Sequence, residues 1–282
     1  MRIVWQVVLA LAVSAPTLSG QAAPQSGSVE FVARATPTGG RPEPVLRFPL
    51  YLLRKSFAEI QKEAETSEPQ PDLDRFVDTL EVSKELKAWM KRTRTVQLTG
   101  SEFMRRVTVN DIFDVPEFFE AYMTRNAGDV TVGFPKPKYR ERDRESNPQK
   151  YERQRQEYHE QIRKFIETYP HSREGMDLHL VQLDPGQRWA QQQAERQRRV
   201  RNRWLALAQT RYLVARTETD LEGRGAFAGI PPGEYWLSTL EGEATAGDVR
   251  LRWDFPVAVR AGRATWLELS NINAVQPERS GR

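Results

Sequence analysis

The sequence predicts an α+β fold in which a discontinuous, antiparallel β-sandwich carries an inserted, mainly α-helical subdomain. Apolar residues alternate with a period of two near both ends of the chain, which is typical of strands. In the middle, their spacing changes to three and four residues, which is typical of helices. Because the first two strands cannot bury a sheet face alone, they must pair with the last ones. We assign residues 26–55 plus 209–272 to the sandwich, 56–208 to the insertion and 273–282 to a tail.

Length, charge and cysteine content exclude several classes of protein. The chain has 282 residues, enough to bury a sizeable core without covalent cross-links. Its 42 Lys and Arg against 38 Asp and Glu leave a net charge of +4, which is weak support for a nucleic-acid partner, and we expect none. The absence of cysteine excludes disulfides, thiolate catalysis and thiolate metal sites.

Residues 1–22 have the three parts of a secretory signal peptide. Met1-Arg2 precedes an apolar run over residues 3–13 that only Gln6 interrupts, and small residues lead to Ala22. The run is too short to span a membrane, and no other long apolar run follows it. We expect export to the periplasm, the cell surface or the medium, without a transmembrane span in the mature chain. The alternative is an uncleaved N-terminal anchor.

The first two strands are expected at residues 28–35 and 44–55. In the second, Pro49 favours an edge position or a bulge, because proline cannot donate to a sheet ladder. The helical period begins at Ser56. Its clearest helical set, spaced i, i+3, i+4 and i+7, is Leu73, Phe76, Val77 and Leu80.

Capping residues and prolines predict where the other helices of the insertion begin and end. Ser101 is expected to cap a helix over residues 102–107, and Pro116 to lie in the first turn of the next. Residues 129–134 are expected to form either a short strand or an extended connector. A long helix is expected from Asn147-Pro148 to Pro170, and a second over about residues 187–207. The loop between them holds a possible strand at residues 176–183, and the two helices suggest an antiparallel pair.

Residues 219–237 are interpreted as a β-hairpin. Asp220 with Gly223 supplies one tight turn, and Pro231-Pro232-Gly233 supplies another through proline's fixed φ and glycine's permitted positive φ. Strands are also expected, from the same alternation, at residues 210–217, 247–260 and 264–270.

This stretch resembles the carboxypeptidase regulatory-like domain, a small transthyretin-like (prealbumin-like) β-sandwich. The matching residues are Thr219-Asp220, Gly223, Phe227 and Ile230-Pro231-Pro232-Gly233-Glu234-Tyr235. Gly27-Ser28-Val29 and residues 45–53 could supply the strands that open such a domain. The resemblance implies a structural and interaction module that is not a catalyst. Ordinary members lack the long insertion present here, so the resemblance does not account for residues 56–208.

Candidate metal ligands are few. His159 precedes Glu160, but no second histidine follows four positions later, so the zinc-protease helix pattern is missing. His171 and His179 could bind a metal together with Asp177. Surface or helix-end histidines are the simpler interpretation, and we predict no metal site, no cofactor and no catalytic residue.

Acidic residues are plentiful in the insertion, where paired carboxylates could hydrolyse glycosides if they met in a cleft. The candidates are Asp72, Asp74, Asp78, Asp111, Asp114, Glu117 and Glu120. For Asp72 and Asp74, the preference for negative charge at a helix start is the better explanation. No phosphate-binding loop or Gly-x-Ser-x-Gly nucleophile elbow is present, and Gly223-Arg224-Gly225 is interpreted as a turn.

Five arginines crowd the second long helix and could follow a polyanion. They are Arg196, Arg198, Arg199, Arg201 and Arg203. The alternative is that they are solvated or paired with glutamates of the facing long helix. Those glutamates are Glu152, Glu157, Glu160 and Glu167.

Trp236, Trp253 and Trp266 fall in predicted strands and could form a ligand platform. If Tyr235 and Leu237 point inward, Trp236 points outward, and the same parity directs Trp266 outward. Outward aromatics provide either a seat for the helical insertion, which we favour, or a surface for stacking sugars.

The sequence therefore predicts an exported, non-enzymatic binding or structural protein. It would act through contacts with another envelope protein. Two alternatives remain open: a carbohydrate-binding module that uses outward aromatics, and a hydrolase with its site in the helical insertion.

Overall fold

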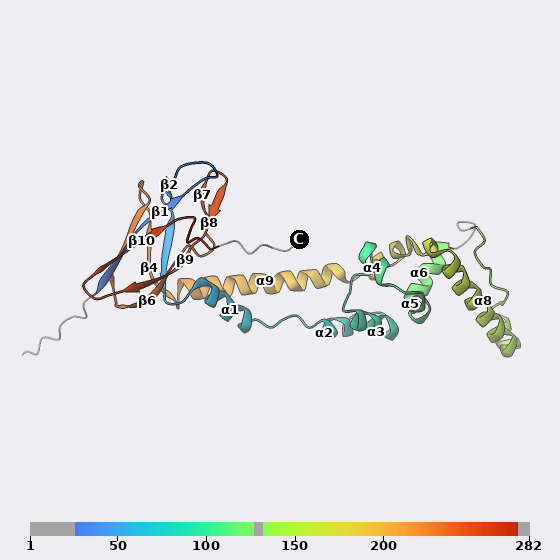
Figure 1. The fold of residues 1–282 in the computed structure, drawn as a ribbon. Coiled ribbons are helices and arrows are strands. Elements are labelled where there is room, and N and C mark those ends of the chain that lie inside the picture. Colours follow the sequence, from blue (N-terminus) through green and yellow to red (C-terminus); the bar gives the residue numbers. More distant parts are fainter. Residues whose placement is uncertain (1–25, 127–131, 276–282) are drawn as a thin grey trace, which may run out of the picture. The chain divides into compact units, whose positions relative to one another are not determined.

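The computed structural model describes residues 26–126 and 132–275, and these divide into two compact units (Figure 1). Residues up to 64 and from 202 onward form the first, called here the sheet unit, and residues 65–201 form the second, the helical unit. The sheet unit therefore also includes residues 56–64 and 202–208, which were expected to belong to the helical insertion. The predicted signal peptide and most of the predicted tail lie outside the described residues.

The first sheet is built around the N-terminal strand, β1 (Gly27–Ala35). On one side β1 pairs with β5 (Arg224–Ile230) and, near its end, with the short β2 (Glu43–Pro44), both antiparallel. On the other side it pairs with β10 (Ala264–Leu269), and this pair is parallel. The expectation of a purely antiparallel sandwich is therefore wrong at this pair. The physical reason is that β10 follows a strand of the other sheet, so no hairpin imposes its direction relative to β1.

The second sheet is antiparallel throughout, in the order β4-β3-β6-β9. Its strands are β3 (Pro49–Leu53), β4 (Leu213–Glu218), β6 (Gly233–Ser238) and β9 (Asp254–Val259). Since β3 lies between β4 and β6, the edge position expected from Pro49 is wrong for the strand as a whole. The ladder with β6 begins only at Tyr51, and the alternative of a bulge has a counterpart in the register shift between Leu52 and Leu53. Pro49 is tolerated because it is the first residue of the strand. A separate small hairpin joins β7 (Ala244–Ala246) to β8 (Val249–Leu251).

The predicted hairpin over residues 219–237 is wrong in its pairing. Its two strands form as expected, but β5 belongs to the first sheet and β6 to the second, so Pro231-Pro232 crosses between sheets. The Tyr235 hydroxyl donates to the Pro231 carbonyl at 2.9 Å and closes this crossing. Gly223 turns the chain at φ +77°, where a Cβ would lie 2.5 Å from the Ala33 carbonyl oxygen. Only glycine fits such a position.

The two sheets share one hydrophobic core, which establishes the α+β class together with the helices. Alternate residues of each strand face this core, as the period of two requires. Its buried members include Val29, Phe31, Ala33, Leu50, Leu52, Phe227, Ile230, Tyr235, Leu237, Val257, Val259 and Leu269.

α1 (Phe57–Ser67) begins at a doubly capped end within the sheet unit. Ser56 and Glu59 form reciprocal hydrogen bonds, since Glu59 N–H donates to Ser56 Oγ and Ser56 N–H to the Glu59 carboxylate. Asp254 of β9 accepts from the amides of Phe57 and Ala58 at 2.8 and 3.4 Å. These contacts satisfy backbone donors that a helix start leaves unpaired.

The helical unit contains a series of short helices and one long one. They are α2 (Leu73–Asp78), α3 (Lys84–Thr93), α4 (Gly100–Arg106), α5 (Val109–Asp114), α6 (Pro116–Asn126), α7 (Asp143–Ser146) and α8 (Pro148–Thr168). Three turns of 3-10 helix follow: η1 (Pro170–Arg173), η2 (Met176–His179) and η3 (Val181–Leu183). α9 (Gly186–Gln209) begins in this unit and ends in the sheet unit.

Several predicted boundaries are confirmed and others are wrong. Pro116 begins α6 and Asn147 caps α8, as expected. The possible strand at residues 176–183 is wrong, since residues 176–179 and 181–183 form two turns of 3-10 helix. α4 begins at Gly100, so Ser101 lies inside it and is not its cap. Of the possible strand at 129–134, residues 132–134 form a turn and coil, and the rest lies outside the described residues.

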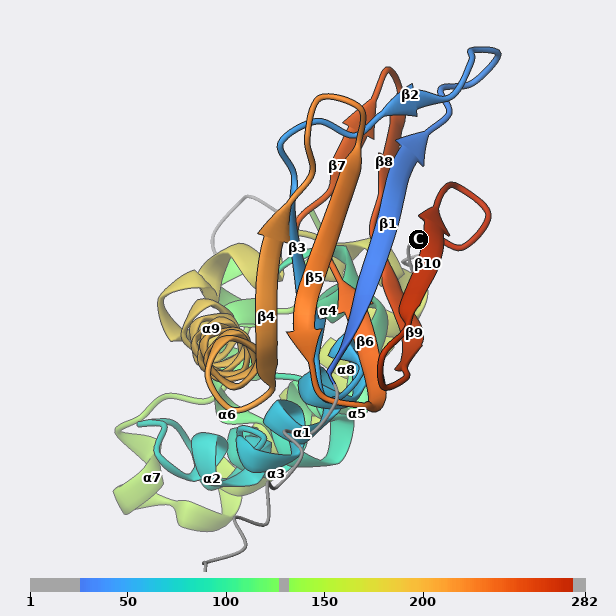
Figure 2. The ribbon, with the colours of Figure 1, turned by 90° about the vertical axis from the view of Figure 1, so that its left-hand side faces the viewer.

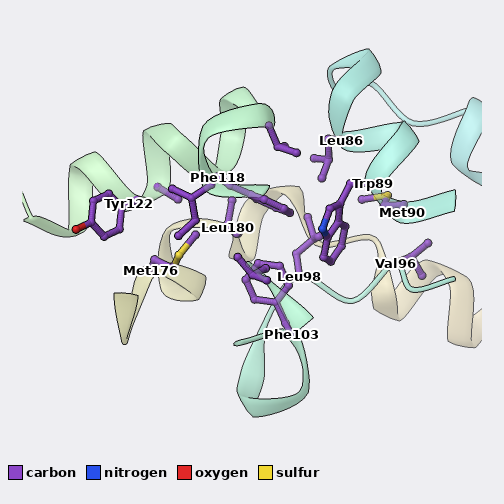
Figure 3. Close-up of a cluster of buried hydrophobic side chains, with 14 of the residues drawn as sticks. Leu86, Trp89, Met90, Val96, Leu98, Phe103, Phe118, Tyr122, Met176 and Leu180 are labelled. Atoms are coloured by element: carbon purple, nitrogen blue, oxygen red, sulfur yellow. The ribbon is translucent and has the colours of Figure 1, made fainter. Parts of the chain in front are cut away.

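The core of the helical unit is centred on three aromatic rings from three helices (Figure 3). Trp89 of α3, Phe103 of α4 and Phe118 of α6 meet edge to face, with ring centroids 5.0 to 5.8 Å apart. Such geometry is favourable because a positive ring edge meets a negative ring face. α8 adds Tyr158, Ile162 and Ile166 to this core.

No helix within the described residues is both long enough and apolar enough to cross a membrane.

Candidate binding face on the first sheet

The three tryptophans of the predicted platform lie in different environments. Trp266 of β10 is 63 % exposed, as strand parity predicts. Trp236 of β6 is half-buried, between the buried Tyr235 and Leu237. Trp253 is only 1 % exposed, and its indole N–H donates to the Ser270 carbonyl at 2.9 Å. Trp253 therefore cannot belong to an exposed platform, because its ring is packed in the hydrophobic core of the sheet unit.

Strand register places a row of side chains around Trp266. Glu30 of β1 lies opposite Trp266 on one side and opposite Ala226 of β5 on the other. One step along, Val32 lies between Glu268 and Arg224. Figure 2 shows β5, β1 and β10 side by side in this sheet. The outward residues Glu30, Val32, Arg34, Arg224, Ala226 and Trp266 are called here the Trp266 face.

The Trp266 face is hollowed by a groove of about 550 Å³. Ala226, which faces outward opposite Glu30, contributes only a methyl group to it. The lining residues are Glu30, Phe31, Val32, Arg34, Asp220, Arg224, Gly225, Ala226 and Trp266.

Three charged side chains of the groove are available to a ligand. Glu30, Arg34 and Arg224 make no side-chain hydrogen bond or ion pair to any other residue that the structure describes. Asp220 is different, since its carboxylate accepts from the amides of Glu222 and Arg224 at 2.9 and 2.7 Å and thereby holds the turn. The face thus combines an exposed aromatic ring with unpaired hydrogen-bonding charges of both signs.

The histidines occupy three separate environments. His159 packs against Phe113 and Phe119, with ring centroids 5.9 and 5.1 Å away, and burial, with Arg155 nearby, lowers its pKa. His171 and His179 are exposed, and Asp177 accepts from the Gly100 amide at 2.9 Å, so it serves the start of α4. Across the two described stretches, no three His, Asp or Glu residues gather as metal ligands would.

Five of the seven acidic candidates of the helical unit have structural partners. Asp72 caps α2, as expected, and Asp111 forms a capping box with Thr108 and pairs with Arg92 at 2.7 Å. Glu117 accepts from both the amide and the hydroxyl of Ser83 at the start of α3. Asp74 and Asp78 pair with Arg94 and Lys91. Asp114 and Glu120 are exposed on separate helices.

The arginines of α9 do not converge on one site. Arg196 donates to the carbonyls of Glu65 and Glu68, and Arg199 pairs with the Glu68 carboxylate at 3.2 Å. The expected partners on α8 are therefore wrong, since Glu152 and Glu157 pair within α8 with Arg155 and Arg153. Arg198, Arg201 and Arg203 are exposed.

Sequence reasoning did not find Glu30, Arg34 and Arg224. The signal was present, since Glu30 and Arg34 alternate with the core residues Val29, Phe31 and Ala33. Their proximity to Trp266 could not be predicted from the sequence, because it depends on the parallel register between β1 and β10.

No family model and no curated protein sequence matches this chain. Among solved structures it is similar to the pilus backbone RrgB from Streptococcus pneumoniae, with 11 % identity and a TM-score of 0.23. That similarity covers 87 % of this chain but 41 % of the pilus protein's chain, so this chain spans less than half of its length. Similarity at this level assigns neither fold nor function.

Proposed function

We propose that this chain is an exported, non-enzymatic binding protein that acts through protein contacts at the periplasm or cell surface. The observation that carries the proposal is the Trp266 face, where a 63 % exposed tryptophan stands among unpaired charged groups. Exposed Trp and Arg side chains supply much of the binding energy in protein interfaces. The expected partner is another envelope protein, and export itself rests on residues 1–22 of the sequence.

The proposal includes the identity of the sheet unit as a transthyretin-like, carboxypeptidase regulatory-like β-sandwich. Two features support it. The two sheets share a single core. In addition, the residues that carry the resemblance perform a structural task, because the segment from Ile230 to Tyr235 crosses between the sheets and its ends are tied by the Tyr235–Pro231 hydrogen bond.

The alternative of a hydrolase in the helical insertion is less well supported. Five of the seven carboxylates that could serve it cap helices or form ion pairs, and the other two, Asp114 and Glu120, are exposed on separate helices. A general acid and a nucleophile must converge on one substrate, and these groups bind at separate helix ends.

The test is a comparative capture of partners from the envelope fraction of the source cells. The mature chain, its Trp266→Ala variant and an Ile272→Ala control are immobilised, and recovered proteins are quantified by mass spectrometry. Ile272 is 96 % exposed and lies after β10, outside the Trp266 face. We expect one partner whose recovery falls roughly tenfold with Trp266→Ala alone, as loss of an interface anchor predicts. Equal recovery by all three proteins would reject the proposal.

Carbohydrate binding is the second candidate, and the exposed ring of Trp266 favours it specifically. A sugar ring can stack on an indole while Glu30 and the two arginines bind its hydroxyls. A glycan array probed with the mature chain separates the two functions. Binding that Trp266→Ala abolishes, in the absence of a captured protein, would replace the protein-contact role by this one.

A further inference from the structure

The loop between α3 and α4 alternates buried and exposed side chains over residues 96–98, as a half-buried strand does, although no strand forms there. Val96 and Leu98 are 4 % and 0 % exposed and point into the core beside Trp89 and Phe103, whereas Gln97 between them is exposed (Figure 3). This alternation is that of a half-buried strand. No strand pairs with residues 95–98 in the part of the chain that the structure describes.

Part of this loop's backbone is unsatisfied. Thr95 N–H donates to the Met90 carbonyl at 3.2 Å, and Leu98 N–H to the Asp184 carboxylate at 3.0 Å. The amides of Val96 and Gln97 and the carbonyls of residues 95–97 have no protein partner among the described residues. A row of unpaired backbone donors and acceptors of this kind is a template for another strand.

A groove of about 750 Å³ lies along the same loop, wholly within the helical unit. The first turns of α9 form its opposite wall, with Trp189, Ala190 and Gln193. Val181, which is 52 % exposed, adds an apolar surface. The other lining residues are Leu73, Arg94, Thr95, Val96, Gln97, Thr99, Asp184, Gly186 and Gln187.

The charged groups of this groove are already neutralised. Arg94 pairs with Asp74 at 2.6 Å. Asp184 accepts from the Leu98 amide, the Thr99 hydroxyl and the Gly186 amide at 3.0, 2.6 and 2.7 Å. The polar groups that remain are the side-chain amides of Gln97, Gln187 and Gln193, which have no hydrogen-bond partner among the described residues. The groove therefore complements an uncharged ligand that both donates and accepts hydrogen bonds.

We propose that this groove docks an extended, uncharged peptide segment of a partner protein, which pairs its backbone with residues 95–97. An extended peptide backbone carries the alternating donors and acceptors that the loop lacks, and main-chain pairing of this kind gives affinity in known strand-addition complexes. The glutamine amides bind outward backbone groups, and Val181 contacts an alternate side chain. The inference rests on the proposed protein-contact role and adds a second contact surface to it.

The test uses the full mature chain and a random peptide library displayed on phage. Enriched peptides are synthesised, and their Kd values are measured by titration calorimetry against the wild type, Ala190→Trp and Gln192→Trp. Both positions are exposed on α9, but only Ala190 lines the groove. Circular dichroism confirms that both variants fold. We expect uncharged peptides whose affinity falls roughly tenfold or more with Ala190→Trp and is unchanged with Gln192→Trp.

Hydrogen exchange supplies the second measurement. On peptide binding, the amide of Val96 or that of Gln97 should exchange more slowly, because it gains an acceptor. Only one of the two is expected to change, since consecutive amides of a strand point to opposite edges. Failure to enrich any peptide, equal binding to Ala190→Trp, or unchanged exchange at these two amides would overturn the inference. Trp266→Ala should bind the same peptides normally, since Trp266 belongs to the other unit. A failed peptide-binding test would therefore not affect the capture of a partner that depends on Trp266. The two proposals can be rejected independently.

Discussion

At the residue scale, Gly225 has no side chain, and this allows β1 and β5 to pair with the Phe31 ring packed against it. It lies opposite Phe31 in the ladder between β1 and β5, and a Cβ there would lie 2.3 Å from the Phe31 ring. The ring fills the space that a side chain at position 225 would occupy. Glycine is therefore required here by close approach, not by an unusual backbone angle.

We expect Gly225→Ala to lower the free energy of unfolding by roughly 1 to 3 kcal/mol, because the Phe31 ring must move within a packed core. Urea unfolding measures the change. Ala228→Val is the matched control, since Ala228 is exposed on the same strand. It should alter stability by less than about 0.5 kcal/mol. A Gly225→Ala protein as stable as the control would show that Phe31 does not occupy this space.

Asp254 is a buried carboxylate whose charge is costly to the sheet unit. Burial raises its pKa above the ordinary 3.8, although the Phe57 and Ala58 amides act in the opposite direction. A folded-state pKa above the unfolded value means that the protonated form is favoured by folding. The contribution of protonated Asp254 to the free energy of unfolding is fully present below the unfolded-state pKa. It is lost as the pH rises through the folded-state pKa.

The comparison of wild type with Asp254→Asn isolates this effect. The variant keeps an acceptor for the start of α1 but cannot ionise. Relative to the variant, the wild type should therefore lose stability as the pH rises from below 3.8 through the raised folded-state pKa. Urea unfolding at a series of pH values measures the difference. A difference that stays constant, or that grows in favour of the wild type, would contradict the raised pKa.

At the scale of elements, three helix starts in this protein are stabilised by a side chain of another helix or strand. Asp254 of β9 serves α1, Asp177 of η2 serves α4, and Glu117 of α6 serves the residue before α3. Each such contact satisfies an orphan backbone donor and also joins two elements that are distant in sequence. Glu117, a catalytic candidate in the sequence, is thus explained as a connection between two helices.

Glu117→Ala should lower the free energy of unfolding by about 2 kcal/mol, since it removes two charge-assisted hydrogen bonds of 2.7 Å to Ser83. Glu120→Ala, on the same helix and exposed, should have an effect below about 0.5 kcal/mol. Both changes are measured by urea unfolding. Similar effects of the two substitutions would mean that the α3–α6 contact contributes nothing specific.

At the scale of the whole molecule, the residues that the structure describes form two hydrophobic cores that share no residue. One lies between the sheets, and the other surrounds Trp89, Phe103 and Phe118. Each belongs to one compact unit. A core of its own is what allows a part of a chain to unfold as a separate cooperative unit.

We therefore expect two transitions in differential scanning calorimetry. Leu52→Ala, in the sheet core, should lower one transition temperature, and Phe118→Ala, in the helical core, should lower the other. Each deletion should cost about 2 to 5 kcal/mol in its own unit. One transition that both substitutions shift would show that the two cores unfold together.

The sequence by itself determined those features that depend on near neighbours. Alternation located β1 and directed Trp266 outward, and the three- and four-residue spacing located the helices. Pro116 and Asn147-Pro148 marked helix starts correctly, because capping and proline's fixed φ act within one turn.

Only the tertiary structure decided which strands pair. Pro231-Pro232-Gly233 encodes a change of direction equally well within a sheet or between two sheets, so local chemistry could not distinguish a hairpin from the crossing that the chain makes. Three other features could not be predicted from the sequence for the same reason. They are the parallel pairing of β1 with β10, the burial of Trp253 and the unpaired loop at residues 95–98. Each depends on residues far away in sequence, whose approach is set by burial of the shared core and not by any local preference.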